Sequence, residues 1–273
     1  MIAQQPSVSF SGNIPAFYDA YLGPLFFEPF SLDMAERISA LRPKKVLELA
    51  CGTGRLTRHL IRTLPGNPEI TATDINPAML AYAGEQLKDE PSIRWDMVDA
   101  VSLPYADNSF NCIVSQFGVM FYSDRPKAYA EAYRALKPDG MLLCLAWDKL
   151  SNNPAALITH QTLEHFFPVD TPGFYQIPFS YHDEHLIQYD LALGGFKEMY
   201  SVLISLTGYA STAEAAAKGL LEGTPAYTAI MERDEALMQP LQRELSARLA
   251  ERFGATDLKV PLQARLFVAA KQD

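Results

Sequence analysis

Two glycines, Gly52 and Gly54, lie in the stretch LELACGTGRLT at residues 47–57, between an apolar run and a segment with helical spacing. Glycine costs backbone entropy, so this turn indicates either a tight strand-to-helix connection or a backbone that a ligand approaches closely. The free amide groups at the start of a helix can bind polar or anionic groups of a ligand. The turn alone is a weak signal, and a purely structural turn is the alternative.

Acidic residues follow the next two apolar runs. Asp74 ends the run EITATD, and Asp99 comes directly after SIRWDMV. The carboxylate of Asp74 can accept hydrogen bonds from a ribose diol, and that of Asp99 can accept from the exocyclic amine of an adenine. Each aspartate could instead cap a turn or a helix. Taken together at three successive strand ends, the glycine turn and the two carboxylates predict a site for an adenosine-containing ligand.

The elements that must position these residues alternate between residues 43 and 147. Short apolar runs are separated by segments with helical spacing, and this order predicts right-handed βαβ units with a parallel sheet covered on both faces. In such a sheet, ligands bind beyond the carboxyl ends of the strands. The predicted strands are KVLELA, EITATD, SIRWDMV, FNCIVSQ and MLLCLA, followed late in the chain by FKEMYSVLISL and ARLFVAA.

Four stretches resemble successive motifs of the class I S-adenosylmethionine-dependent methyltransferases: VLELACGTG, TATDINPAML, DAVSLPYADNSFNCIVSQFGVMF and RALKPDGMLLCLAW. They are similar to the small-molecule branch that includes the ubiquinone and menaquinone C-methyltransferases. The resemblance covers about residues 43–147, and Gly194-Gly195-Phe196 matches part of the family's usual ending. It implies an α/β fold with a Rossmann-like, seven-stranded, mostly parallel sheet, an antiparallel last strand, helices on both faces and a helical substrate cap.

The same resemblance implies the cofactor S-adenosyl-L-methionine, with S-adenosyl-L-homocysteine as the product. Glu48 and the turn at 50–54 would hold the methionine portion, Asp74 the ribose and Asp99 the adenine amine. The carbonyls of residues 50 and 116 would face the ammonium group. Ile75 and Met79 would flank the adenine, with plain core packing as the alternative. The full implied set is Glu48, Ala50, Cys51, Gly52, Gly54, Asp74, Ile75, Met79, Asp99, Ala100 and Gln116.

One residue departs from the family pattern. Ala50 stands where the family usually has its first glycine. Alanine adopts most backbone conformations outside the left-handed region. We therefore expect a small local adjustment at this position and no loss of cofactor binding.

The predicted function is methyl transfer to a small, apolar or aromatic acceptor, with no catalytic residue identifiable from the sequence. A protein that binds the cofactor without catalysis is the first alternative. An NAD(P)-dependent dehydrogenase is the second, but the turn lacks the third glycine of G-x-G-x-x-G. The pair Tyr133 and Lys137 has the spacing of short-chain dehydrogenases, yet Pro138 places it at the end of a helix.

The expected organisation is one compact domain with three parts: an N-terminal helical cap at 1–40, a cofactor-binding core at 41–150, and the rest of the sheet with inserted cap segments at 151–273. Tyr18, Tyr21 and Phe117 are the candidates for contact with the acceptor. Gly208, Gly219 and Gly223 punctuate one cap segment, either as hinges of a lid or as simple helix stops.

The composition of the chain limits the kinds of partner that we expect it to bind. The net charge is −9, from 23 basic and 32 acidic side chains, and no basic cluster favours nucleic acid. No apolar stretch reaches the length of a membrane span, and three scattered cysteines suit buried thiols, so we expect a cytoplasmic protein. His59 is expected to face solvent, and His182 with His185 is not expected to bind a metal. The oligomeric state stays open.

Overall fold

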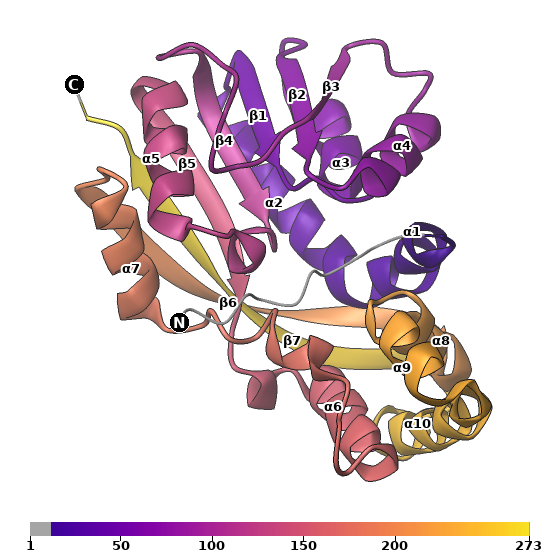
Figure 1. Cartoon of the computed structure of the whole chain (residues 1–273). Coiled ribbons are helices and arrows are strands. Elements are labelled where there is room, and N and C mark those ends of the chain that lie inside the picture. Colours follow the sequence, from indigo (N-terminus) through magenta and orange to yellow (C-terminus); the bar gives the residue numbers. More distant parts are fainter. Residues whose placement is uncertain (1–11, 273) are drawn as a thin grey trace.

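The computed structural model describes residues 12–272, and its frame is a seven-stranded sheet (Figure 1). The strand order is β3-β2-β1-β4-β5-β7-β6. Neighbours from β3 to β5 pair in parallel, whereas β7 runs antiparallel to both β5 and β6. This arrangement confirms the predicted Rossmann-like sheet with an antiparallel last strand. The strands are β1 (Lys45–Leu49), β2 (Glu69–Asp74), β3 (Ile93–Met97), β4 (Phe110–Gln116), β5 (Leu136–Trp147), β6 (Glu198–Thr212) and β7 (Thr256–Ala270).

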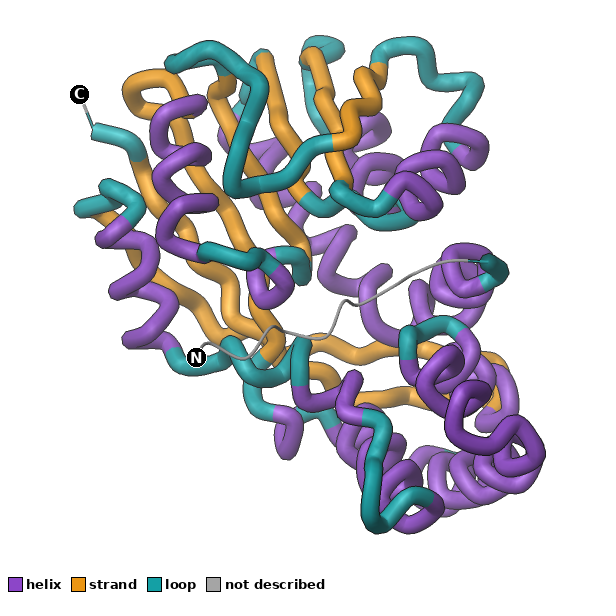
Figure 2. Tube along the Cα trace, in the orientation of Figure 1, coloured by secondary structure: helices purple, strands orange, loops and turns teal. Residues whose placement is uncertain are grey.

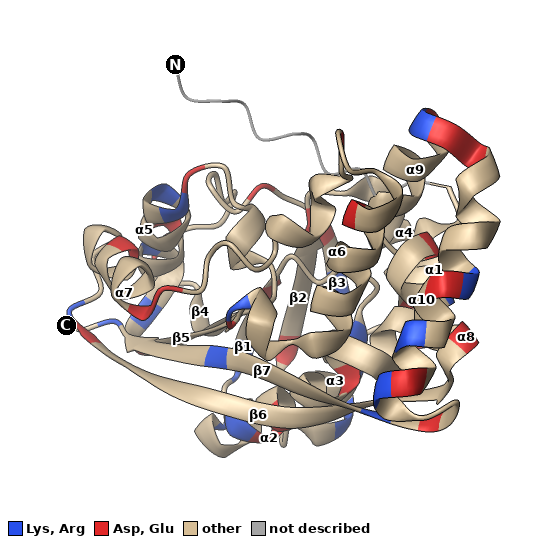
Figure 3. Cartoon of the chain, turned by 90° about the horizontal axis from the view of Figure 1, so that it is seen from below, with Lys and Arg blue, Asp and Glu red and all other residues tan. Residues whose placement is uncertain are grey.

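Helices cover both faces of this sheet. The helices α2 and α3 lie on one face and α5 and α7 on the other, as the two orthogonal views show (Figures 1 and 3). The α-helices are α1 (Ile14–Phe17), α2 (Glu28–Leu41), α3 (Arg55–Thr63), α4 (Pro77–Gln86), α5 (Arg125–Ala135), α6 (Pro154–Phe166), α7 (Glu184–Leu193), α8 (Ala213–Glu222), α9 (Ala226–Asp234) and α10 (Met238–Phe253). The π-helix η1 (Tyr18–Phe27) joins α1 to α2, and short 3-10 turns are η2 (Val119–Phe121), η3 (Leu150–Asn152), η4 (Gly173–Gln176) and η5 (Glu235–Leu237).

The central strands consist mainly of apolar residues with few polar interruptions, such as Glu48 in β1. Val46 and Leu47 of β1 and the run 112–114 of β4 are completely buried, as expected for parallel strands covered on both faces. At the end of β2, the Asn76 side chain accepts hydrogen bonds from the amides of Ala78 and Met79 and so caps α4, with Pro77 at its first position. These local signals fix the strand ends that carry the site.

Two long strands extend the sheet at one end. β5 pairs with β7 only as far as Trp147 and Ala264, and beyond that point β7 pairs with β6 alone, down to Thr212 opposite Thr256. The corresponding strands predicted from the sequence were shorter. Residues 137–140 (KPDG), which precede the predicted strand MLLCLA, lie inside β5. Figure 2 shows the helical cap gathered around this two-stranded extension. Its main members are α6, α8, α9 and α10.

The cap glycines have a packing role. A Cβ atom on Gly208 would collide with the carbonyl of Leu25, and one on Gly219 would lie 2.8 Å from the Cβ of Tyr21. At Gly223, the added atom would lie 3.1 Å from the amide nitrogen of Tyr18. Gly208 lies within β6 and Gly219 within α8, so neither is a hinge between elements. All three let the backbone of η1 approach β6 and α8 closely.

Candidate functional site

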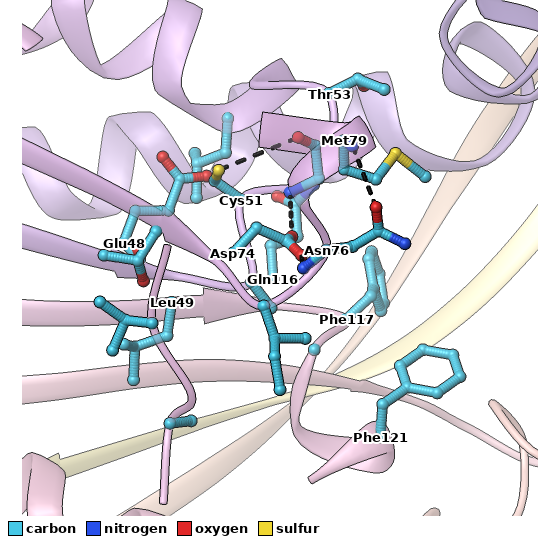
Figure 4. Close-up of a pocket in the computed structure, with 18 of the residues that line it drawn as sticks. Glu48, Leu49, Cys51, Thr53, Asp74, Asn76, Met79, Gln116, Phe117 and Phe121 are labelled. Carbon is cyan, nitrogen blue, oxygen red and sulfur yellow. Dashed lines mark hydrogen bonds between the residues drawn. The ribbon is translucent and has the colours of Figure 1, made fainter. Parts of the chain in front are cut away.

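A cavity of about 400 Å³ lies at the carboxyl ends of β1, β2 and β4 (Figure 4). Ten of the eleven residues predicted to hold the cofactor line it, and Gly54 is the exception. The lining residues that the sequence analysis did not single out come mainly from the loop after β4, the start of α3 and η1. The most informative of these are Phe27, Thr53, Arg55, Phe121 and Tyr122.

The two glycines of the turn have different roles. Gly52 has φ of +57°, and a Cβ atom there would meet no protein atom within 4 Å beside the cavity that this residue lines. Gly54 also has positive φ, but its Cβ would lie 3.2 Å from Ala83 and 3.3 Å from Leu87. Gly52 thus leaves room at the cavity, whereas Gly54 lets the turn pack against the α4 region.

Ala50 lies in the left-handed region, with φ of +56°, which is contrary to the expectation that alanine would avoid it. This conformation is costly for a residue with a Cβ atom, and it explains why glycine is the usual residue here. The alanine methyl group is accommodated by Gly118, where a Cβ atom would lie only 2.5 Å from the Cβ of Ala50. Gly118 follows Phe117, which also has positive φ.

Glu48 is a buried carboxyl at the end of the cavity nearest α3. Its side chain is 2% exposed and accepts a hydrogen bond of 2.6 Å from the hydroxyl of Thr57. Burial raises the pKa of Glu48 to about 8, and the charge of Asp74 acts in the same direction, while the Thr57 hydrogen bond lowers it. A cationic group entering the cavity would stabilise the ionised form of Glu48.

Asp74 organises the turn from the end of β2. One carboxylate oxygen accepts from the amide of Gly52 at 2.8 Å, and the other accepts from the amide of Asn76 at 2.8 Å (Figure 4). Burial raises the pKa of Asp74, and the backbone amides oppose this effect. Each carboxylate oxygen can accept more than one hydrogen bond, so both can still bind hydroxyl groups of a ligand.

The remaining predicted residues also line the cavity. Asp99 accepts from the amide of Val101 at 3.1 Å and also lines the cavity, so it is both a turn cap and a possible ligand contact. Ile75 is 63% exposed at the cavity, which excludes core packing for its side chain, whereas Met79 is buried. Ala100 and Gln116 complete the wall.

An ionic cluster behind the turn holds η1 in place. Arg55 donates to Glu28 at 2.5 Å and to Asp19 at 2.8 Å, and the Arg58 guanidinium lies 3.3 Å from Asp19. His59 is buried and its Nε2 lies 2.8 Å from Glu28, so the expectation that it faces solvent was wrong. The reason is tertiary: the N-terminal segment folds over the outer face of α3 and supplies the two carboxylates.

A second, smaller cavity of about 60 Å³ adjoins the first. Four residues line both: Tyr18, Phe27, Phe117 and Phe121. The others are Leu22, Phe26, Trp147, Phe174, Tyr175, Pro178, Phe179, Leu220 and Thr224. Of the three candidates for acceptor contact, Tyr18 and Phe117 lie at this junction. Tyr21 lies outside both linings, because it packs beside Phe17 and against Gly219 of α8.

The geometry bears on the other hypotheses. The ring of Tyr133 packs edge-on against Phe196, and neither Tyr133 nor Lys137 lines either cavity, so a dehydrogenase pair has no site here. Within residues 12–272, no group of three His, Cys, Asp or Glu side chains is arranged to hold a metal ion. None of the helices in this range is long and apolar enough to cross a membrane.

Residues 46–140 match the family model described as "Methyltransferase domain". The ubiquinone/menaquinone biosynthesis C-methyltransferase UbiE of Proteus mirabilis is 35% identical over 130 residues, covering 46% of this chain and 52% of that protein. UbiE of Legionella pneumophila strain Philadelphia 1 is 40% identical over 112 residues, covering 40% and 45%. The chain therefore spans about half the length of the curated relatives it matches.

Solved structures share the fold at low identity. YcgJ of Bacillus subtilis superposes with a TM-score of 0.57 at 18% identity, covering 89% of this chain and 99% of that chain. Phosphoethanolamine N-methyltransferase 2 of Haemonchus contortus gives 0.60 at 18% identity, covering 95% and 57%. The [4+2]-cyclase SpnF gives 0.59 at 16%, covering 95% and 92%. Residues 46–140, which match that family model, thus lie within a fold that these solved structures share.

Proposed function

Because residues 46–140 match the methyltransferase domain family, we propose that this chain transfers a methyl group from S-adenosyl-L-methionine to a small-molecule acceptor. The observation that carries the proposal is the set of three carboxyl groups, Glu48, Asp74 and Asp99, placed with the glycine turn around one 400 Å³ cavity. Their spacing along the strand ends suits the ammonium, ribose and adenine of that cofactor.

The residues present fit the cofactor. Asp74 and Asp99 can accept hydrogen bonds from the ribose hydroxyls and the adenine amine, and both line the cavity. Gly52 leaves the space that a side chain would fill. Glu48 lines the cavity where its carboxylate would neutralise the ammonium group of the cofactor. The cofactor, when bound, supplies a methyl group on a positively charged sulfur.

The chain itself must align the acceptor and exclude water. Tyr18 and Phe27 come from the two ends of η1 and lie at the junction of the two cavities, where they can position the acceptor. Alignment of two reactants in a dry site accounts for a large part of the catalysis of such a displacement. No described residue is needed as a covalent intermediate.

The acceptor that we propose is small and apolar or aromatic. This part of the proposal is supported by the second cavity, whose lining contains no charged side chain within the described residues. The relatives named as C-methyltransferases match at most 46% of this chain, and the segments that build the second cavity lie largely outside residues 46–140. The acceptor must therefore be inferred from the cavity and not from those names.

A cofactor-binding protein without methyltransferase activity is the second candidate. One structure with this fold is titled a [4+2]-cyclase, and fold by itself does not determine chemistry. The discriminating experiment is incubation of the protein and methyl-labelled S-adenosylmethionine with a metabolite extract. A labelled small molecule supports methyl transfer, whereas tight cofactor binding without labelled product from any extract supports the second candidate.

Cofactor binding is tested first, by calorimetry. We expect a Kd in the micromolar range or tighter, roughly −8 kcal/mol. The change Asp74→Ala should weaken binding by about 1.5–3 kcal/mol, the usual contribution of hydrogen bonds to a charged group. Asp89→Ala is the matched control, because Asp89 is exposed and lines neither cavity. Preference for a nicotinamide dinucleotide would overturn the proposal.

A further inference from the structure

We propose that the methyl acceptor is an uncharged amine with an apolar or aromatic body, and that the aromatic walls of the second cavity hold the cation formed by its methylation. This inference rests on the methyl transfer proposed above and adds the substrate class. It follows from the faces, hydroxyl groups and charges that surround the two cavities.

The walls of the second cavity are aromatic. Nine of its thirteen lining residues carry aromatic rings, and none carries a charge. The rings of Phe117 and Trp147 stack with centroids 3.8 Å apart, and Phe27 lies tilted against both at 5.7 Å and 6.1 Å. Phe179 extends the wall, 5.8 Å from Trp147. Ring faces carry partial negative charge and attract cations, most strongly where water is excluded.

Two of the three hydroxyl side chains that line this cavity, those of Tyr175 and Thr224, offer an anion no free hydrogen. The Tyr175 hydroxyl donates to the carbonyl of Leu220 at 2.5 Å, and the Thr224 hydroxyl donates to the same carbonyl at 3.0 Å. The hydrogens of both hydroxyls therefore have a backbone acceptor, and the hydroxyls of Thr224 and Thr159 also lie beside the Tyr175 oxygen. A phenolate or carboxylate would find no donor from these two residues.

The adjoining cavity has an acidic balance. Glu48, Asp74 and Asp99 line it, and Arg55 is the basic residue among its lining. The Arg55 guanidinium is already paired with the carboxylates of Glu28 and Asp19. The lining side chains thus offer an anionic acceptor only ring faces and carboxyl groups, so its charge would be compensated by the positively charged sulfur of the cofactor and not by the protein.

The transfer needs no protein base before it occurs. The amine enters as the neutral form, which burial favours. Its nitrogen lone pair forms a bond to the methyl carbon while the carbon–sulfur bond breaks and keeps its electron pair on sulfur. The positive charge moves from sulfur to nitrogen. A tertiary amine ends as a quaternary ammonium ion, and a secondary or primary amine then releases its N–H proton to solvent.

The test compares three probes of similar shape on protein saturated with S-adenosylhomocysteine. They are (3-hydroxyphenyl)trimethylammonium, its uncharged isostere 3-tert-butylphenol, and the anion 3-hydroxybenzoate, with calorimetry as the measurement. We expect the cation to bind at least tenfold more tightly than the isostere and the anion to bind more weakly than both. Equal or tighter binding of the isostere or the anion would overturn the inference.

Two variants test whether the rings of the second cavity cause the preference for the cation. Phe174→Leu and Phe179→Leu keep an apolar side chain but remove a ring that lines the second cavity alone. Each should reduce the preference for the cation severalfold, while Phe166→Leu, which changes a half-buried ring outside both cavities, should leave it unchanged. An undiminished preference in both variants would overturn the inference. Lack of S-adenosylhomocysteine binding by the unaltered protein would instead refute the proposed function.

Discussion

At the scale of single residues, the site depends on groups held in states that they would avoid in water. Glu48 is a carboxyl whose pKa burial raises to about 8, and Ala50 carries a methyl group in a backbone conformation that favours glycine. In both cases the position of the residue at the cavity imposes the unusual state. Both departures have measurable consequences.

The raised pKa of Glu48 predicts that cofactor affinity increases with pH. Near neutral pH the free protein holds a proton on Glu48, and binding of the cofactor's ammonium group expels it. We expect the Kd to fall by up to about tenfold per pH unit below pH 8, as long as the cofactor's own ammonium group stays protonated. Calorimetry in buffers of different ionisation enthalpy measures the released proton. Glu48→Gln should abolish this release, and a pH-independent Kd in the unaltered protein would contradict the prediction.

The same shift affects the stability of the free protein. The pKa of Glu48 is about 8 in the folded state and near its ordinary value of 4.5 in the unfolded chain, so folding takes up a proton between these values. The free energy of unfolding should therefore fall as pH rises from about 4.5 to about 8. Urea unfolding without ligand checks the sign, and Glu48→Gln should flatten the profile. Asp74 contributes in the same direction, because its pKa is also raised.

The contact between residues 50 and 118 predicts a non-additive pair of substitutions. Gly118→Ala places a Cβ 2.5 Å from the Cβ of Ala50 and 2.8 Å from the Ser115 hydroxyl, and it should cost about 1–3 kcal/mol in unfolding free energy. Adding Ala50→Gly removes the first clash and should restore part of that loss. Gly84→Ala, at an open helical position, is the control and should not destabilise. Purely additive effects would show that the two residues do not compete for space.

At the scale of elements, the N-terminal π-helix η1 is tied to α3 by charges that lie mostly out of water. The side chains of Asp19 and Arg55 are each 11% exposed. The same π-helix presents Tyr18 and Phe27 to the cavities. One short element thus joins the cofactor turn to the wall of the acceptor cavity.

Breaking the ion pairs between η1 and α3 should lower the free energy of unfolding substantially. Asp19→Asn leaves the Arg55 and Arg58 charges without their shared carboxylate and should lower the free energy of unfolding by about 3 kcal/mol. Asp33→Asn breaks an exposed pair with Arg37 within α2 and should cost about 0.5 kcal/mol or less. Urea unfolding of both variants gives the comparison. Similar small losses would mean that the buried cluster contributes little to holding η1.

At the scale of the whole molecule, ligand binding should stabilise the fold as one unit, because the cavity walls come from segments as distant as η1 and the loop after β4. At a concentration 100 times the Kd, S-adenosylhomocysteine should add about 2.7 kcal/mol. For a chain of this size, that is a rise in Tm of roughly 5–10 °C. Differential scanning fluorimetry measures it, and an equal rise with NAD would contradict the assignment of the cofactor.

The sequence predicts the sheet better than the cap. β2 and β4 have the predicted bounds, and each ends in a polar residue, Asp74 in β2 and Gln116 in β4. The positive φ of Ala50 was missed, although the glycine that the resembled family usually has at this position was a signal for it. The burial of His59 was also missed, because its partner Glu28 belongs to a distant helix. Tyr21 lines neither cavity, and the aromatic composition of a segment does not say which rings face a cavity.

The close fit between η1 and the cap glycines has a consequence for the synthesis of the protein on the ribosome. Leu25 and Phe30 are fully buried, yet β6 and α8, against which η1 lies, belong to the last third of the chain. At about 5–20 residues per second of translation, roughly 10–40 s pass between the synthesis of η1 and that of its partners. Throughout that interval the nascent chain carries an apolar, aromatic segment that lacks two of the elements against which it packs in the folded protein. Such a segment is a natural binding site for chaperones at the ribosome, and the completed protein no longer displays it.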